Sequence, residues 1–121
     1  MTRESLIKIE NCGLIKLNQL LGKKWSLPIL HSFIFDEIQT FTQIEKKFKN
    51  DIHPTTLSNR LKLFEQFNII SRQKNTYKIT DFGKLLIKTQ YELKLKAKQN
   101  SLSIPEECQH GECICNKFFM K

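Results

Sequence analysis

Residues 53–68, HPTTLSNRLKLFEQFN, contain the signals that decide the fold. Pro54 suits the first position of a helix, where its missing N–H costs nothing. Leu57, Leu61 and Phe64 follow at helical spacing and form one apolar stripe. Asn68 tolerates the left-handed conformation that ends many helices. The stretch therefore predicts an amphipathic helix that turns its apolar stripe into a core.

The opposite flank of this predicted helix carries Thr55, Ser58, Asn59 and Lys62. These side chains form hydrogen bonds, carry no negative charge and are mostly short, so the helix backbone can lie close to the edges of bases. An ordinary surface helix with a solvated polar flank is the alternative interpretation. The neighbouring segments favour the DNA-reading helix.

The segment before this helix predicts a second, shorter one. Thr42-x-x-Glu45 has the form of a capping box, Ile44 and Phe48 share one face, and residues 50–51 end the run. Residues 39–41 predict a very short strand. Two short helices joined by a tight turn form a helix-turn-helix unit, with residues 53–68 as its recognition helix.

The segment after the helix changes to a period of two. Residues 69–73 and 76–80 predict two strands around a tight turn at Lys74-Asn75, and a hairpin in this place is a wing. Residues 53–80 hold five basic residues and one acidic residue, a net charge of +4 out of +8 for the whole chain. This concentration favours a polyanionic partner over a merely solvated hairpin.

The ends of the chain predict further helices. Residues 5–21 predict a first helix, and Ser26 caps a second that turns Leu27, Leu30 and Ile34 inward. Thr80 caps a last helix over residues 81–98. Its predicted inner stripe consists of Phe82, Leu85, Leu86, Thr89 and Leu93.

Composition and length give the domain organisation and the compartment. We expect a mainly α protein with a small β-hairpin, a winged helix-turn-helix that dimerises through its terminal helices. Packing of those two helices within one chain is the alternative. The winged-helix domain is predicted at residues 1–100 and a cysteine-rich tail at residues 101–121. With no apolar run of about 18 residues and no signal-peptide pattern, we expect no membrane partner and a cytoplasmic location.

Several short motifs resemble HxlR-type winged-helix transcriptional regulators, relatives of the MarR and ArsR groups. The resemblance covers roughly residues 12–95. It rests on Cys12, Gly22-Lys23-Lys24-Trp25, Phe41-Thr42-Gln43-Ile44, Ile52, Leu57-Ser58-Asn59-Arg60-Leu61, Ile69-Ile70-Ser71-Arg72 and Tyr77-Lys78-Ile79-Thr80-Asp81-Phe82-Gly83. It implies a homodimeric DNA-binding regulator whose dimer is built from the terminal helices. It also implies that Cys12 matches a cysteine that senses oxidants or electrophiles in some members. His53 departs from the Ser or Thr usual at the helix cap, and the wing is shorter than in most members.

The predicted DNA contacts divide by element. Asn59 suits bidentate contact with adenine, and Arg60 or Lys62 suits guanine. Thr55, Thr56 and Ser58 lie near the helix start and suit phosphates or thymine methyl groups. On the wing, the predicted phosphate contacts are Arg72, Lys74 and Lys78.

Four cysteines allow three interpretations. Cys108, Cys113 and Cys115 lie with His110 in a C-x-H-x-x-C-x-C pattern, a soft ligand set that suits zinc or copper(I). A thiol or disulfide switch, with or without Cys12, is the second interpretation. An ordinary reduced tail is the third. No cofactor is required by any other feature of the sequence.

Other functions have weaker support. An enzyme is not expected, because no nucleophile, base and orienting group can be named together, and no glycine-rich phosphate loop occurs. A metal-sensing ArsR-like repressor would share the fold and use the tail cysteines. A non-specific, chromatin-like DNA-binding protein would share the charge.

Overall fold

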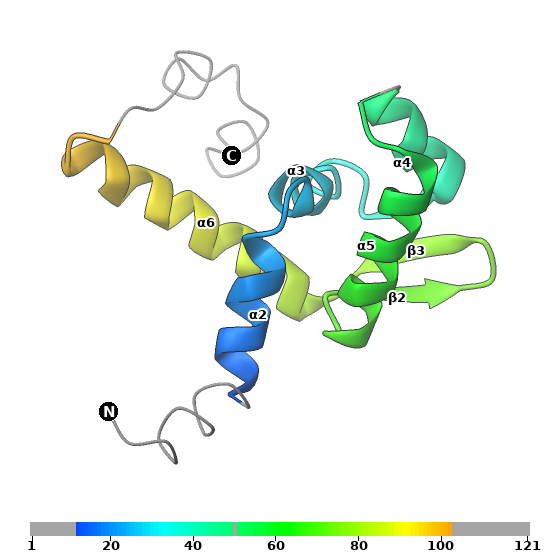
Figure 1. Cartoon of the computed structure of the whole chain (residues 1–121), viewed down its shortest axis with the longest axis horizontal. Helices are drawn as coiled ribbons and strands as arrows, with labels where there is room; N and C mark the ends of the chain where they lie inside the picture. Colours follow the sequence, from blue (N-terminus) through cyan, green and yellow to red (C-terminus); the bar gives the residue numbers. More distant parts are fainter. Residues whose placement is uncertain (1–11, 50, 103–121) are drawn as a thin grey trace.

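A computed structural model describes residues 12–49 and 51–102 of the chain (Figure 1). Its elements, in chain order, are α2 (Gly13–Leu21), α3 (Ser26–His31), β1 (Ile38–Thr40), α4 (Phe41–Phe48), α5 (Pro54–Gln66), β2 (Ile70–Gln73), β3 (Thr76–Ile79) and α6 (Asp81–Gln99). A mainly helical chain with a small sheet was predicted, and this is confirmed. None of the helices in the described ranges combines the length and apolarity needed to cross a bilayer.

The sheet has three antiparallel strands in the order β1-β3-β2. The predicted hairpin is present, with its tight turn at Lys74, whose φ is 54°. β1 covers residues 38–40, one residue earlier than predicted, and pairs Gln39 with Tyr77. Successive residues of a strand point to opposite faces, so Gln39, Tyr77 and Ile79 are buried on the helix side while Lys78 is exposed.

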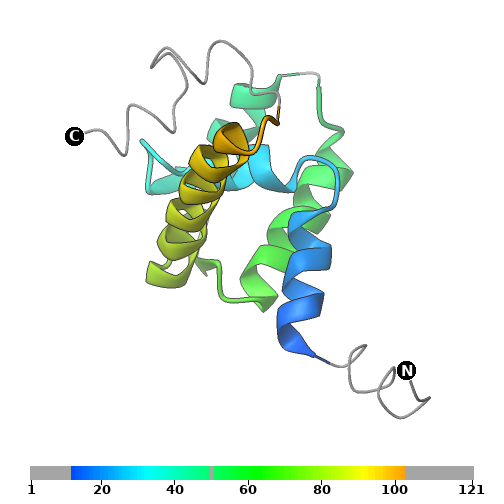
Figure 2. The same cartoon turned by 90° about the vertical axis from the view of Figure 1, so that its left-hand side faces the viewer.

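The core lies between α5, the sheet and the terminal helices, and Figure 2 shows α6 on one side of it with α2 and α5 on the other. The three residues of the predicted apolar stripe of α5, Leu57, Leu61 and Phe64, are at most 1% exposed. Ile29 and Leu30 of α3 meet them in the same cluster. Figure 1 shows α4, α5 and the hairpin together at one end of α6, and the opposite end of α6 extends away from them. The helix-turn-helix unit and its wing therefore form one body with a long helix leading out of it.

Two predicted caps are wrong. Ser26 is the first residue of α3 rather than its cap; it is fully buried and its Oγ donates to the Leu20 carbonyl at 2.6 Å. The cap of α4 is Thr40, and its capping box pairs Thr40 with Gln43, not Thr42 with Glu45. Both pairs have the same spacing, so the sequence alone left the register of this cap open by two residues.

The predicted inner stripe of α6 is also wrong. Leu86 is buried as expected, but Phe82, Leu85 and Leu93 are 36%, 55% and 58% exposed. The residues that face the core are Gly83, Leu86 and Ile87. α6 carries two apolar stripes, and the first turn fixes which one turns inward, because Gly83 is the residue that fits against the sheet. The predicted first helix is present from Gly13, and residues 5–11 lie outside the described ranges.

Candidate nucleic-acid interface

The start of α5 is held by its own local sequence. The cap is His53, whose Nδ1 accepts a hydrogen bond from the Thr55 N–H at 3.2 Å, and Pro54 follows as the first helical residue. A ring nitrogen accepts only when it carries no proton, so this contact requires the tautomer protonated at Nε2. Asn68 adopts the predicted left-handed conformation after the helix, with a φ of 58°. The helix therefore begins and ends where the sequence predicts, to within two residues.

The flank of α5 away from the core is open to solvent. Thr55, Asn59 and Lys62 are exposed, and Thr56 and Ser58 are partly exposed. Thr55, Asn59 and Lys62 are therefore open to a partner that approaches this flank. Its first turn also presents backbone N–H groups and the positive end of the helix dipole, which attract phosphate.

Arg60 lies differently from its neighbours. Its Nη2 donates to the Lys24 carbonyl at 3.2 Å, and its Nε is buried with no hydrogen-bond partner among the described residues. The side chain therefore packs against the segment between α2 and α3. Among the residues predicted to read bases, Arg60 is the one that the structure ties to the protein itself.

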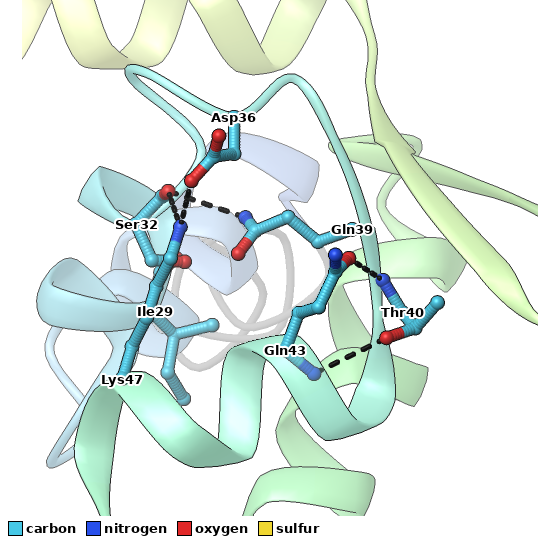
Figure 3. Close-up of polar contacts among 7 residues, drawn as sticks. All are labelled: Ile29, Ser32, Asp36, Gln39, Thr40, Gln43 and Lys47. Carbon is cyan, nitrogen blue, oxygen red and sulfur yellow. Dashed lines mark hydrogen bonds and ion pairs between the residues drawn. The ribbon is translucent and has the colours of Figure 1, made fainter.

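Helix α4, the first of the helix-turn-helix pair, is fixed at both ends (Figure 3). At its start, Thr40 Oγ1 accepts from the Gln43 N–H at 3.2 Å and Gln43 Oε1 accepts from the Thr40 N–H at 2.8 Å. Toward its end, Lys47 Nζ donates to Asp36 Oδ2 at 2.7 Å and to the Ser32 carbonyl at 3.0 Å. The Lys47 contacts hold α4 against the segment between α3 and β1.

The wing presents its basic residues on two sides. Arg72 lies over the Tyr77 ring at 5.6 Å, and its Nε donates to the Lys74 carbonyl at 3.4 Å. Lys78 pairs with Ser71 across the hairpin and points to the face away from the helices. All three predicted basic residues, Arg72, Lys74 and Lys78, are exposed. Arg72 and Lys74 lie together near the tip, whereas Lys78 does not join them.

A hollow of about 370 Å³ separates the wing from the start of α4. Thr42 and Asn75 line it together with Arg72. Neither Thr42 nor Asn75 was among the predicted DNA contacts. The sequence did hold a signal for Thr42, since a polar residue near the start of the first helix of a helix-turn-helix unit lies where that helix crosses the DNA backbone.

The cysteines are only partly described. Cys12 directly precedes α2 as a free, half-buried thiol. Cys108, His110, Cys113 and Cys115 lie outside the described residues. Within the described ranges, no group of three or more His, Cys, Asp or Glu side chains could hold a metal ion.

Comparison with known proteins agrees with this geometry. A family profile described as HxlR-like helix-turn-helix matches residues 20–103. Comparison with curated sequences gave no significant match. The quinone-bound structure of YodB from B. subtilis is 31% identical, with a TM-score of 0.64 over 73% of this chain and 99% of that chain.

Two further structures of the same B. subtilis protein are similar to this chain. The reduced form, named as a transcriptional regulator, is 30% identical, with a TM-score of 0.63 over 73% of this chain and 92% of that one. The diamide-treated form is 27% identical, with a TM-score of 0.62 over 78% and 97%. The family and these neighbours support a DNA-binding transcription regulator. With its winged helix-turn-helix fold and a profile match over most of its length, the chain belongs to the HxlR-like helix-turn-helix family.

Proposed function

We propose that this protein is a sequence-specific transcription regulator that binds a pseudo-palindromic operator as a homodimer and responds to oxidants or electrophiles through its cysteines. The observation that carries the proposal is the two-sided character of α5. Leu57, Leu61 and Phe64 fasten one side to the core, and the other side leaves Asn59 and Lys62 exposed beside a basic hairpin. Such a helix fits the major groove of duplex DNA.

Base recognition is assigned to the exposed flank. Asn59 makes bidentate contact with adenine N6 and N7, and Lys62 reaches guanine. Thr55, Thr56 and Ser58 at the start of the helix contact phosphates or thymine methyl groups. Arg60 is left out of this assignment, because its guanidinium binds the Lys24 carbonyl.

Phosphate contact is assigned to the wing and the start of α4. Arg72 and Lys74 lie at the end of the hairpin beside the hollow that Thr42 lines. Each neutralised phosphate releases counterions, so these contacts strengthen binding to all sequences and make it sensitive to salt. Lys78 faces away from the helices and contributes as part of the general positive field.

The proposed dimer uses the apolar stripe of α6. Phe82, Leu85 and Leu93 recur along one face of this helix and are exposed in the single chain, as is Leu14 of α2. A second copy of the chain is the occupant that supplies a matching apolar stripe through a two-fold axis. Two such subunits set their recognition helices about 34 Å apart, one turn of DNA. Leu85→Glu and Leu93→Glu are expected to convert a dimer into a monomer in light scattering, and Lys88→Glu on the same helix serves as control.

The proposed signal enters at Cys12. The three neighbouring structures are of a reduced, a diamide-treated and a quinone-bound regulator. In a quinone reaction, the Cys12 sulfur forms a bond to a ring carbon, and the thiol proton and the displaced ring proton end on the two oxygens. The product is a thioether of the hydroquinone, and no other oxidant is consumed. Intact mass spectrometry of wild type and Cys12→Ser tests this step directly.

The decisive experiment is footprinting on genomic fragments, followed by binding to the protected sequence. We expect a discrete palindromic footprint, and Asn59→Ala is expected to cost about 1–3 kcal/mol at one base position in each half-site. Uniform coverage would instead indicate a non-specific, chromatin-like protein, and release by added metal would indicate an ArsR-like sensor. An Asn59→Ala protein with unchanged sequence preference would contradict the docking.

A further inference from the structure

The segment between α2 and α3 contacts both helices of the helix-turn-helix unit. We name this segment, together with the first residue of α3, the elbow (residues 22–26). The Lys24 carbonyl of the elbow accepts the hydrogen bond from Arg60 of α5 at 3.2 Å. Its Trp25 ring meets the Phe48 ring of α4 edge-on, with ring centres 6.4 Å apart and planes at 68°. The elbow that follows α2 therefore contacts both α5 and α4.

The elbow itself is held in one conformation. Trp25 has a left-handed φ of 74°, which a bulky side chain keeps only where its surroundings determine it. Ser26 is fully buried, with its Oγ on the Leu20 carbonyl at 2.6 Å and its N–H on the Lys23 carbonyl at 3.1 Å. Lys24 Nζ lies over the Trp25 ring at 5.5 Å. Movement of α2 relative to the helix-turn-helix unit would break several of these contacts together.

Arg60 is the contact that the recognition helix makes with this elbow. It joins residues 36 positions apart in the chain, and its Nε is buried without a hydrogen-bond partner among the described residues. The residue as a whole is only partly buried, so Nε is the part of the guanidinium that loses water, while Nη2 makes its contact near the surface. Lys62, two positions further on, is exposed on the flank assigned to DNA. Arg60 thus faces the protein where Lys62 faces outward.

We propose that Arg60 fixes the half-site spacing of the operator by clamping the recognition helix onto the elbow, and that it does not read a base. This inference rests on the proposed homodimer. If α2 and α6 join the subunits, the angle between α5 and α2 sets the distance between the two recognition helices. One added base pair moves a half-site by about 3.4 Å along the DNA and turns it by about 34°. A dimer in which the angle between α5 and α2 is fixed binds such an operator weakly. A dimer in which this angle varies binds it nearly as well as the native operator.

The test compares operators that keep the half-sites and change only the centre. Full-length protein is titrated against duplexes whose central spacer is native, one base pair shorter or one base pair longer, at one salt concentration. Wild type is expected to prefer the native spacer by about tenfold or more, the equivalent of one charged hydrogen bond. Arg60→Met is expected to reduce this preference to about threefold or less. Its preference among bases within each half-site is expected to stay as in wild type.

Lys62→Met is the matched control, since it removes a charge from the same helix without touching the elbow. It is expected to weaken binding to every spacer alike and to relax the base preference at its guanine, leaving the spacer preference intact. Arg60→Lys keeps the charge but loses the planar donor group, so its spacer preference is expected to lie between those of wild type and Arg60→Met. It takes the place of Arg60→Met in the test if circular dichroism shows that Arg60→Met folds poorly.

Each outcome decides the matter. Wild-type spacer preference in both folded Arg60 variants would overturn the clamp. A changed base preference in Arg60→Met with its spacer preference intact would show that Arg60 reads DNA, which also overturns it. A wild-type protein indifferent to spacing would overturn the dimeric operator proposal, and the clamp with it. If wild type selects the native spacer and the Arg60 variants select it equally well, the clamp is overturned and the dimeric operator proposal stands.

Discussion

Replacing Gly83 by alanine is expected to destabilise the protein, although the position lies in a helix. Alanine is favoured over glycine in a helix interior by about 1 kcal/mol, so propensity alone predicts stabilisation. A Cβ at Gly83, however, would lie 2.4 Å from the Ile69 carbonyl oxygen and 2.6 Å from Ile79 Cγ1. Contacts this short force the start of α6 away from the sheet.

The size of the destabilisation depends on which atoms must move to make room for the added Cβ. The Ile69 carbonyl also accepts from the Thr80 N–H at 3.0 Å and from Thr80 Oγ1 at 2.9 Å, so it cannot yield without weakening the cap of α6. Overpacking costs about 1–3 kcal/mol and each weakened hydrogen bond about 1 kcal/mol. After subtracting the propensity gain, we expect a net loss of about 2–4 kcal/mol.

Thermal unfolding followed by circular dichroism measures this loss. For a domain of this size, about 2 kcal/mol lowers Tm by roughly 8–16 °C. Gly13→Ala is the matched control, because no described atom lies within 4 Å of a Cβ built there, and a change within about 0.5 kcal/mol is expected. A Gly83→Ala protein as stable as wild type, or more stable, would refute the steric argument.

Three further changes test other parts of the molecule. Lys74→Gln at the wing tip is expected to weaken binding to all DNA sequences alike and to lower the salt slope by about 0.9, and a changed base preference would contradict a phosphate contact. Burial, reinforced by the charge of Lys94, lowers the pKa of His31 below its ordinary value of 6.5. Below about pH 6.5 the unfolded chain therefore binds a proton at His31 that the folded protein does not. The free energy of unfolding is unaffected by this group above about pH 6.5 and falls as the solution becomes more acidic. His31→Gln is expected to flatten this fall, as measured by urea unfolding at about pH 7.5 and 5.5. In the tail, we expect a thiol switch, seen as a reductant-dependent gel mobility that Cys113→Ser reduces, whereas zinc retained after dialysis would support the metal site instead.

The recognition helix and the wing were predictable from the sequence because the residues that specify them are close together in the chain. Pro54, the apolar stripe through Leu61 and the left-handed Asn68 fix the limits of α5 within a few residues of sequence. The turn at Lys74 and the cap at Thr80 are likewise decided by neighbouring residues, and both are confirmed. Such features depend on backbone conformation and hydrogen bonds that close over three or four positions.

The cap of α4 marks where local signals become ambiguous. Thr40 with Gln43 and Thr42 with Glu45 offer the same pattern two residues apart. The pairing of β1 with β3 selects the first, because it holds residues 38–40 in extended conformation and lets the helix begin at Phe41. A contact with a strand almost forty residues away therefore decides the register of a local motif.

The sequence by itself determined the winged helix-turn-helix order, the exposed polar flank of α5 and the basic hairpin beside it, since periodicity and turn residues specify these directly. Only the tertiary structure decided which stripe of α6 turns inward and where the guanidinium of Arg60 goes. A helix with two apolar stripes satisfies its own periodicity either way, and a long side chain reaches either side of its helix. The close packing of Gly83 against Ile69 and Ile79 decides which stripe of α6 turns inward. The Lys24 carbonyl of the elbow decides where the Arg60 guanidinium lies.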